Sequence, residues 1–253
     1  MTPTPILILQ VGTPPDEVRS NVGDLSDWFC LALGKQSIEV EIVRVFEGEH
    51  LPPPDANRVA IITGSWAHVT ERLKWSEDTA QWIREAMKIN MPLFGVCYGH
   101  QLIAHALGGV VDFHPDGREV GCHAINLLPA AESDPLLIDL PTQFAAHLTH
   151  LQTIVKLPQG AEVLAYSAHD RHQIVRYGPN AVSTQFHPEF TPTIAEKCIR
   201  LRADVLASEG RSADALVDDL VDAKDARHLL NRFVELALQT RGAEVMYRDA
   251  SGV

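Results

Sequence analysis

The chain has 253 residues, of which 45% are hydrophobic and 21% charged, so it can bury a large core without disulfides or a structural metal. Its 21 basic and 33 acidic residues give a net charge of −12, which argues against nucleic acid as a partner because no Lys/Arg cluster interrupts the acidic excess. No apolar run approaches the roughly 20 residues that span a bilayer, and the N-terminus lacks the basic region of a signal peptide, so we expect a cytoplasmic protein with reduced thiols and no membrane partner.

In the first half of the chain, strand patterns alternate with helical patterns. Continuous apolar runs, typical of strands buried on both faces, occupy residues 5–11, 58–65 and 92–97. An alternating pattern at 38–46 predicts a strand nearer a sheet edge. Helical spacing with Gly or Pro stops predicts helices at 25–33, 75–89 and 100–109. This order predicts an α/β fold with a flavodoxin-like, doubly wound and mostly parallel sheet.

The pattern changes after Gly109. Residues 110–129 are rich in β-branched side chains around a turn at 115–117, which predicts a small antiparallel β extension. Further strands are predicted at 162–167, 173–177 and 181–185. Residues 193–240 are helical in composition, with a break near Gly210. We therefore expect one domain over residues 1–240, followed by a loosely held C-terminal tail at 241–253.

One cysteine, Cys97, lies between two glycines in the stretch LFGVCYGHQ, where a predicted strand gives way to a predicted helix. Ligands of open parallel sheets bind beyond the carboxyl ends of the strands. The spacing Gly95-x-Cys97-x-Gly99 is that of a nucleophile elbow, in which small neighbours prevent clashes at a strained turn. A helix N-terminus also lowers a thiol pKa. Cys97 is therefore either a nucleophile or an apolar residue placed at such a turn by chance.

The stretch VSTQFHPEF offers a base and an orienting group for this thiol. His187 follows a strand-like run, and Glu189 lies two residues beyond it. Residues two apart in an extended segment point to the same face, so the carboxylate can meet the imidazole. A thiolate nucleophile needs such a base and a third group that orients it. Taken alone the piece is an ordinary surface turn, but its pairing with Cys97 favours catalysis.

These stretches resemble a known family. GVCYGHQLIAHALGG followed by TQFHPEF resembles the class I glutamine amidotransferases, and the likeness covers nearly the whole chain. IITGSWAHV is similar to the oxyanion-loop strand of that family, GREVG to the segment after its nucleophile helix, and HLTHLQTIVKLPQGAEVLAYS to its glutamine-contacting strip. Within the family, the chain resembles stand-alone proteins similar to the glutaminase domain of GMP synthase.

The resemblance implies roles for individual residues and no cofactor or metal. Cys97 would be the nucleophile, His187 the general base and then acid, and Glu189 the orienting carboxylate. The residues that would contact the glutamyl substrate are Gln101, through its side chain, and His150 and Leu151, through the surrounding backbone.

The oxyanion hole would use two backbone amides. One is that of Tyr98, and the other comes from the Gly64-Ser65 turn, with the Ser65 amide preferred. The chain departs from the family pattern at the next position, because Trp66 stands where the family usually has proline. We expect this indole to narrow or cover the entrance to the site.

Three functions remain open at this point. The first is a stand-alone hydrolase that cleaves the side-chain amide of glutamine or of a γ-glutamyl compound through a cysteine thioester. The second is a glutaminase subunit that supplies ammonia to a separately encoded synthetase. The third is a non-catalytic binding module that retains the fold.

Other polar features have simpler interpretations. Two His-x-x-His pairs, at 147–150 and 169–172, lack the partner motifs of a metal site, so no metal is expected. Three further cysteines are expected to be small buried hydrophobes, and they are Cys30, Cys122 and Cys198. The acidic run at 212–226 predicts a solvated helix face, and an interface role stays open.

Overall fold

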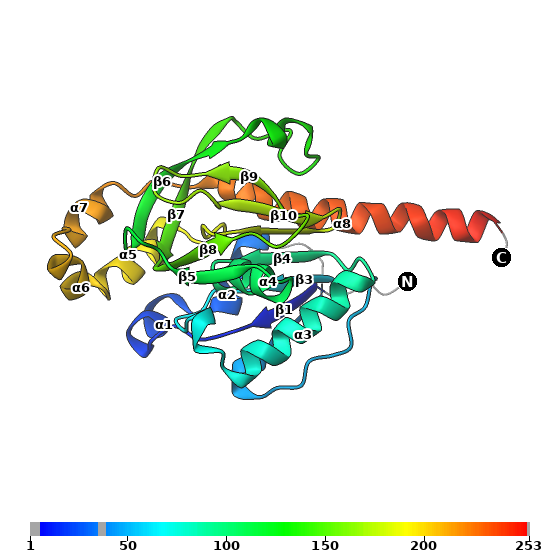
Figure 1. Cartoon of the computed structure of the whole chain (residues 1–253), viewed down its shortest axis with the longest axis horizontal. Helices are drawn as coiled ribbons and strands as arrows, with labels where there is room; N and C mark the ends of the chain where they lie inside the picture. Colours follow the sequence, from blue (N-terminus) through cyan, green and yellow to red (C-terminus); the bar gives the residue numbers. More distant parts are fainter. Residues whose placement is uncertain (1–5, 35–38, 252–253) are drawn as a thin grey trace.

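The computed structural model describes residues 6–34 and 39–251, which form a β-sheet with helices on both faces (Figure 1). The strands of this sheet are β1 (Ile6–Gln10), β2 (Val40–Arg44), β3 (Val59–Ile62), β4 (Leu93–Val96), β6 (Glu119–Leu127), β7 (Gln143–His150), β9 (Glu162–Tyr166), β10 (Ile174–Gly178) and β11 (Ala181–Thr184). Their spatial order is β2-β1-β3-β4-β11-β10-β9-β6-β7. Neighbours from β2 to β11 run parallel, and those from β11 to β7 run antiparallel.

A second, two-stranded antiparallel sheet pairs β5 (Val110–Phe113) with β8 (Gln152–Lys156). The predicted fold class is therefore confirmed: a doubly wound α/β sheet carries an antiparallel extension. In addition to this second sheet, the main sheet itself continues beyond β11 with the antiparallel strands β10, β9, β6 and β7. The predicted ranges 5–11 and 38–46 each begin one residue outside the described residues.

Burial explains why the parallel strands lie where they do. All residues of β1, β3, β4 and β11 are buried, whereas β2, at the sheet edge, is half-exposed. This is the expected difference between continuous apolar runs and the alternating run at 38–46. Because β3, β4 and β11 are parallel neighbours, their carboxyl ends meet at one edge of the sheet. This edge is where ligands of such sheets bind.

The helices are α1 (Asp16–Val22), α2 (Leu25–Leu33), α3 (Lys74–Lys88), α4 (Tyr98–Ala106), α5 (Pro192–Arg200), α6 (Ala203–Ser208), α7 (Ala213–Asp218) and α8 (Lys224–Ser251). Helices α2 and α8 cover one face of the sheet, and α3 and α4 cover the other. Helix α1 was not expected from the sequence. None of the described helices combines the length and apolar character needed to cross a membrane.

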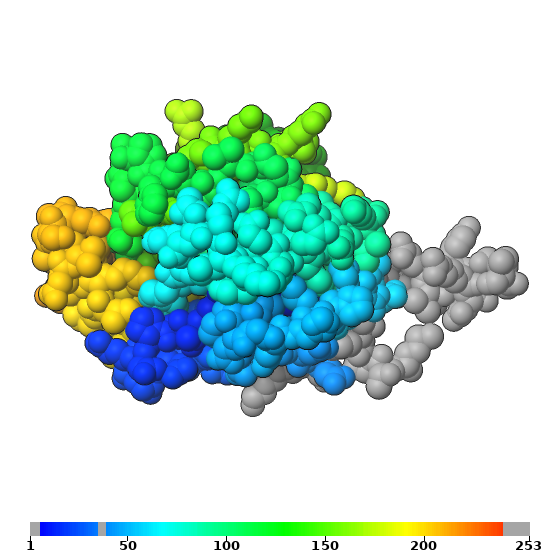
Figure 2. Space-filling view, turned by 60° about the horizontal axis from the view of Figure 1, so that its bottom comes forward, coloured from blue at the N-terminus to red at the C-terminus, as the bar shows by residue number. Residues whose placement is uncertain are grey.

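Helices α5–α7 lie against the N-terminal part of the chain. Figure 2 shows them in yellow and orange beside the blue N-terminal segment, and α1 contacts α5. The predicted break falls at Gly210, which has φ of +74° between α6 and α7. The acidic run is split: α7 ends at Asp218 and α8 begins at Lys224. Since α8 crosses residue 240, the domain boundary expected there stays a prediction.

Candidate active site

Cys97 occupies a strained turn between β4 and α4. Its φ and ψ are +51° and −98°, a region that L-residues rarely adopt and that costs about 1–3 kcal/mol. The turn is held on both sides, because the Cys97 amide donates to the Thr184 carbonyl of β11 at 2.8 Å and the Gln101 amide donates to the Cys97 carbonyl at 3.1 Å. The side chain is 6% exposed.

The two flanking glycines provide the clearance that this turn needs. A Cβ on Gly95 would lie 2.6 Å from the Gly99 carbonyl oxygen. A Cβ on Gly99 would collide with the carbonyl of Ile62 in β3. Helix α4 therefore approaches the sheet so closely that only glycine fits at either position. This close approach explains the Gly-x-Cys-x-Gly spacing read from the sequence.

Replacing Gly95 with alanine is expected to lower the free energy of unfolding by about 1–3 kcal/mol, because the new methyl group must displace the first turn of α4. The same displacement should slow alkylation of Cys97 by iodoacetamide. Denaturant unfolding and mass spectrometry of the alkylated protein measure the two effects. Gly48→Ala is the control for Cys97 reactivity, since Gly48 has open space around it; its own φ of +86° means that any loss of stability there comes from the backbone, and alkylation of Cys97 should keep the wild-type rate. A folded Gly95→Ala protein with wild-type Cys97 reactivity would contradict the assignment.

His187 and Glu189 lie just beyond β11 and are both buried. The imidazole Nδ1 is 2.7 Å from the Glu189 carboxylate oxygen Oε1. The His187 amide donates to the His147 carbonyl of β7 at 2.9 Å, and Phe190 stacks on the imidazole with ring centres 4.1 Å apart. The segment is thus fixed by backbone, by ring packing and by an ion pair.

Cys97 and His187 face each other across Gly64. A Cβ on Gly64 would lie 3.1 Å from Cε1 of His187 and 3.7 Å from Cβ of Cys97. The imidazole Nε2 makes no hydrogen bond to a nitrogen or oxygen atom of the described residues, and the thiol is its remaining polar neighbour. The structure therefore brings together, in one place, the three side chains that the sequence singled out.

Electrostatics favours the thiolate of Cys97. Burial raises the pKa of the thiol, but attraction to the neighbouring His187 imidazolium outweighs burial, and the net pKa is lowered. Burial lowers the pKa of His187. The Glu189 carboxylate and the Cys97 thiolate raise it by more than burial lowers it, so the net pKa is raised. The two shifts therefore favour the thiolate–imidazolium form of the pair over the neutral form.

A cavity of about 210 Å³ opens beside Cys97. Its lining residues come from five parts of the chain, and they include Ser65, Trp66, Tyr98, Gln101, Arg118, Thr149, His150, Leu151, Gln152 and Arg202. This volume lies below the range typical of drug-sized ligands and suits a group of amino-acid size. The expected substrate-contacting residues therefore share one cavity with Cys97.

The expected oxyanion donors lie at this cavity. The Tyr98 amide is in the first turn of α4, where backbone N–H groups have no partner within the helix. Its phenol is occupied elsewhere, 2.7 Å from the Ser76 hydroxyl, and burial raises its pKa to about 12. The Ser65 hydroxyl accepts from the Ala67 amide at 3.1 Å, and the Ser65 amide enters none of the hydrogen bonds found among the described residues.

Trp66, the departure from the family pattern, lines the cavity and joins an aromatic column. Its ring lies edge-on to Trp28, with centres 6.5 Å apart. Trp28 in turn meets Phe190, the residue that stacks on His187. A chain of ring contacts therefore runs from Trp66, in the predicted oxyanion loop, through Trp28 and Phe190 to the imidazole of His187.

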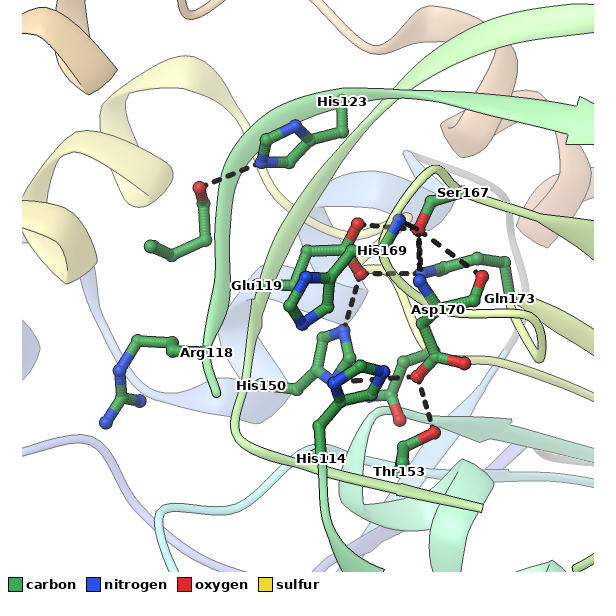
Figure 3. A network of polar contacts seen from close by, with 12 residues as sticks. His114, Arg118, Glu119, His123, His150, Thr153, Ser167, His169, Asp170 and Gln173 are labelled. Atoms are coloured by element: carbon green, nitrogen blue, oxygen red, sulfur yellow. Dashed lines mark hydrogen bonds and ion pairs between the residues drawn. The ribbon is translucent and has the colours of Figure 1, made fainter. Parts of the chain in front are cut away.

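Gln101 and His150 are tied into one buried network. The Gln101 side-chain amide donates to the carbonyl of Gln152 at 2.8 Å, and His150 Nδ1 lies 2.9 Å from the same carbonyl oxygen. Nε2 of His150 lies 2.8 Å from the Glu119 carboxylate (Figure 3). Burial lowers the pKa of His150, but Glu119 and Asp170 raise it more, so its net pKa is raised.

Sequence reasoning singled out neither of these carboxylates as site residues, nor the two cavity arginines. Glu119 and Arg118 lie in the GREVG stretch, which was the one available signal for them. Asp170 and Arg202 carry no motif at all.

The two His-x-x-His pairs do not converge on a metal site. His147 and His150 are three residues apart on β7 and so point to opposite faces. His169 stacks on His114 with ring centres 4.1 Å apart. No group of three or more metal-ligating side chains occurs in the part of the chain that the structure describes. Cys198 is buried, while Cys30 and Cys122 are only half-buried.

Comparison with known proteins gives a consistent result. The family model described as "Glutamine amidotransferase class-I" matches residues 21–202. The chain is 26% identical to gamma-glutamyl peptidase 4 of Arabidopsis thaliana over 74% of this chain and 76% of that protein. It is 34% identical to a glutamine-hydrolyzing GMP synthase subunit of Saccharolobus solfataricus over 53% of this chain and 68% of that protein. The match to the GMP synthase of Thermosipho africanus, 35% identical over 42% of this chain, spans 20% of that longer enzyme.

Solved structures agree on the fold. A glutamine amidotransferase from Thermotoga maritima superposes with a TM-score of 0.74 at 21% identity, covering 92% of this chain and 98% of that one. A glutamine amidotransferase from Methylobacillus flagellatus gives a TM-score of 0.71 at 22% identity, covering 92% of this chain and 95% of that one. Together with the family match over residues 21–202, the elbow and the fold show that this chain belongs to the class I glutamine amidotransferase family.

Proposed function

We propose that the protein is a stand-alone cysteine hydrolase that cleaves the side-chain amide of glutamine or of a γ-glutamyl compound. The observation that carries the proposal is the strained Cys97 turn facing an imidazole that Glu189 holds at 2.7 Å. A nucleophile, a base and an orienting group are the parts that acyl transfer requires. All three come from this one chain, and a cavity of amino-acid size adjoins them.

The proposed reaction has two carbonyl-attack steps. The Cys97 thiolate attacks the γ-carbonyl carbon, and the C–N bond breaks as His187 gives its proton to the departing amine. The glutamyl group is then held as a thioester. His187 takes a proton from water, the hydroxide attacks the thioester carbonyl, and the C–S bond breaks to release glutamate and restore the thiolate.

The same two amides would stabilise the oxyanion in both steps. Those of Tyr98 and Ser65 are the donors we propose, each contributing about 3 kcal/mol to transition-state stabilisation. The Gln101 side chain and the backbone at His150 and Leu151 would hold the glutamyl end, since all three line the cavity.

A glutaminase subunit that supplies ammonia to a separate synthetase is the second candidate. The similarity to the GMP synthase subunit of Saccharolobus solfataricus favours it. In that case glutamine hydrolysis would appear only when the synthetase partner is added. A non-catalytic module is the third, and covalent labelling of Cys97 by a glutamine-analogue electrophile would exclude it.

The test is a glutamate-release screen of the purified protein without partners. We expect glutamate from at least one of L-glutamine, γ-glutamylglycine and γ-glutamyl methylamide, because the thiolate–imidazolium pair is formed within the chain. Glutamate is measured with a coupled dehydrogenase. Release from none of these substrates, at concentrations that saturate binding, would overturn the stand-alone hydrolase.

A further inference from the structure

Two arginines line the catalytic cavity, and no Asp or Glu is among its lining residues. Arg118 directly precedes β6, and Arg202 lies between α5 and α6. Burial and repulsion from Arg118 lower the pKa of Arg202, while Cys198 and, to a smaller extent, Cys97 raise it. Like charges held together in a concave, partly desolvated site are costly unless an anion joins them. The cavity is therefore electrostatically prepared for an anion.

The contacts these cations already make leave donors free. Arg202 donates from Nη1 to the Cys198 carbonyl at 3.0 Å, and its guanidinium lies 5.4 Å from the Trp66 ring centre. Arg118 pairs with Glu209 at 3.5 Å, a distance longer than a charge-assisted hydrogen bond. Figure 3 shows the Arg118 side chain pointing away from the network around Glu119 and His150.

Two buried N–H groups at the cavity have no hydrogen-bond partner among the described residues. They are Nε1 of Trp66 and Nε of Arg118, the atom whose ion-pair partner Glu209 lies 3.5 Å away, beyond a charge-assisted hydrogen bond. Unsatisfied buried donors are rare in folded proteins, and each calls for a partner such as a water molecule, an ion or a ligand. Both belong to residues that line the cavity, so this group of donors points to an acceptor with several oxygen atoms.

The rest of the cavity differs in kind. Gln101, His150 and Gln152 are linked to one another by hydrogen bonds, and the charge of the His150 imidazole is balanced by Glu119. A second groove, of about 810 Å³ along β6, shares Arg118 with the cavity. Arg118 therefore borders both the cavity at Cys97 and this groove.

We propose that Arg118 and Arg202, assisted by the Trp66 indole N–H, form a carboxylate-binding subsite that selects acidic γ-glutamyl substrates. The planar guanidinium fork matches a carboxylate in two parallel hydrogen bonds. The inference rests on the proposed function, since the subsite serves the reaction at Cys97. The carboxylate comes either from the glutamyl α-position or from the departing amine, and the substrates below distinguish these sources.

Arg202→Gln is the primary test. Loss of a charged hydrogen-bond pair should lower kcat/KM by about 10- to 100-fold, mainly through KM, because the contact exists before and during reaction. γ-Glutamylglycine and γ-glutamyl methylamide differ only in the carboxylate of the departing amine. L-Glutamine and 4-aminobutanamide differ only in the α-carboxylate. We expect the fall to be at least tenfold larger for the carboxylate-bearing member of one of these pairs.

The controls separate charge removal from misfolding. Arg200→Gln removes the same charge at the end of α5. This side chain is exposed and pairs with Glu196 and Asp214, so the variant should leave the ratio of kcat/KM values within each substrate pair unchanged. Arg118→Gln should reproduce the effect, and Arg202→Lys, which keeps the charge without the fork, should give a smaller one. Equal falls within both substrate pairs, or no fall, would overturn the subsite.

Binding isolates this proposal from the hydrolase activity. Calorimetry compares γ-glutamylglycine and γ-glutamyl methylamide, and likewise L-glutamine and 4-aminobutanamide, on Cys97→Ala and on Cys97→Ala/Arg202→Gln. A carboxylate preference that the arginine variant loses supports the subsite even if the wild-type protein releases no glutamate. The absence of any carboxylate preference in binding overturns it even if the protein is an active hydrolase.

Discussion

Cys97→Ala is expected to lower the rate of glutamate release by about 10⁴-fold or more, because no other group in the cavity can form the thioester. The substitution removes only the sulfur, and the backbone hydrogen bonds to Thr184 and Gln101 that hold the turn stay available. Circular dichroism and the unfolding midpoint should therefore remain close to those of the wild-type protein. The measurement is the coupled glutamate assay under saturating substrate.

Cys30→Ala provides the matched control for Cys97→Ala. Cys30 is a half-buried free thiol in α2, and burial together with Asp27 raises its pKa, so it is less reactive than Cys97. This variant should keep wild-type turnover. Wild-type turnover in Cys97→Ala would refute the thioester mechanism.

Glu189→Gln should reduce kcat by about 10³- to 10⁴-fold, as expected when the group that orients a catalytic imidazole loses its charge. The carboxylate raises the pKa of His187, so its neutralisation lowers that pKa and depopulates the imidazolium. His187 lowers the pKa of the Cys97 thiol, so the thiol pKa must then rise. In the wild-type protein the thiolate forms at a lower pH than for an ordinary thiol. In the variant it should form only at higher pH.

The pH dependence of Cys97 alkylation by iodoacetamide measures this shift directly, without turnover. The acid limb of the reactivity profile should move to higher pH in Glu189→Gln. Glu196→Gln in α5 is the control because Glu196 pairs with the exposed Arg200, and its profile should match the wild type. A Glu189→Gln profile that also matches the wild type would show that the carboxylate does not govern the thiolate.

Elements that carry their own start and stop signals could be predicted from the sequence. Helix α2 occupies Leu25–Leu33 as expected, because Asp24 caps its start through a capping box and Gly34, at φ of +71°, ends it. Helix α1 was missed, although Pro15 at its N-cap and acidic residues in its first turn were available signals. Its seven residues bury little apolar surface beyond Val18, so the sequence of α1 shows no helical spacing of apolar residues.

The site residues also differ in whether a local sequence signal marks them. Cys97, His187 and Glu189 lie in short motifs, and local spacing already encodes their geometry. The Arg118–Arg202 pair does not, because each residue belongs to a separate segment and the two meet only through the packing of α5 beside the cavity. Trp66 was noticed as an exception to a pattern, but its contact with Arg202 depends on tertiary structure that no local spacing describes.

The tryptophans of the aromatic column beside the imidazole, Trp66 and Trp28, allow the site to be followed by intrinsic fluorescence. Trp66 borders the cavity, and Trp28 lies between it and the ring that stacks on His187. Trp82, by contrast, is tied to the carbonyl of Pro52 on the α3 side. Indole emission responds to neighbouring charge and solvent, so filling of the cavity changes the surroundings of Trp66 directly. Intrinsic fluorescence can therefore follow ligand binding in unlabelled protein, including variants that no longer turn over.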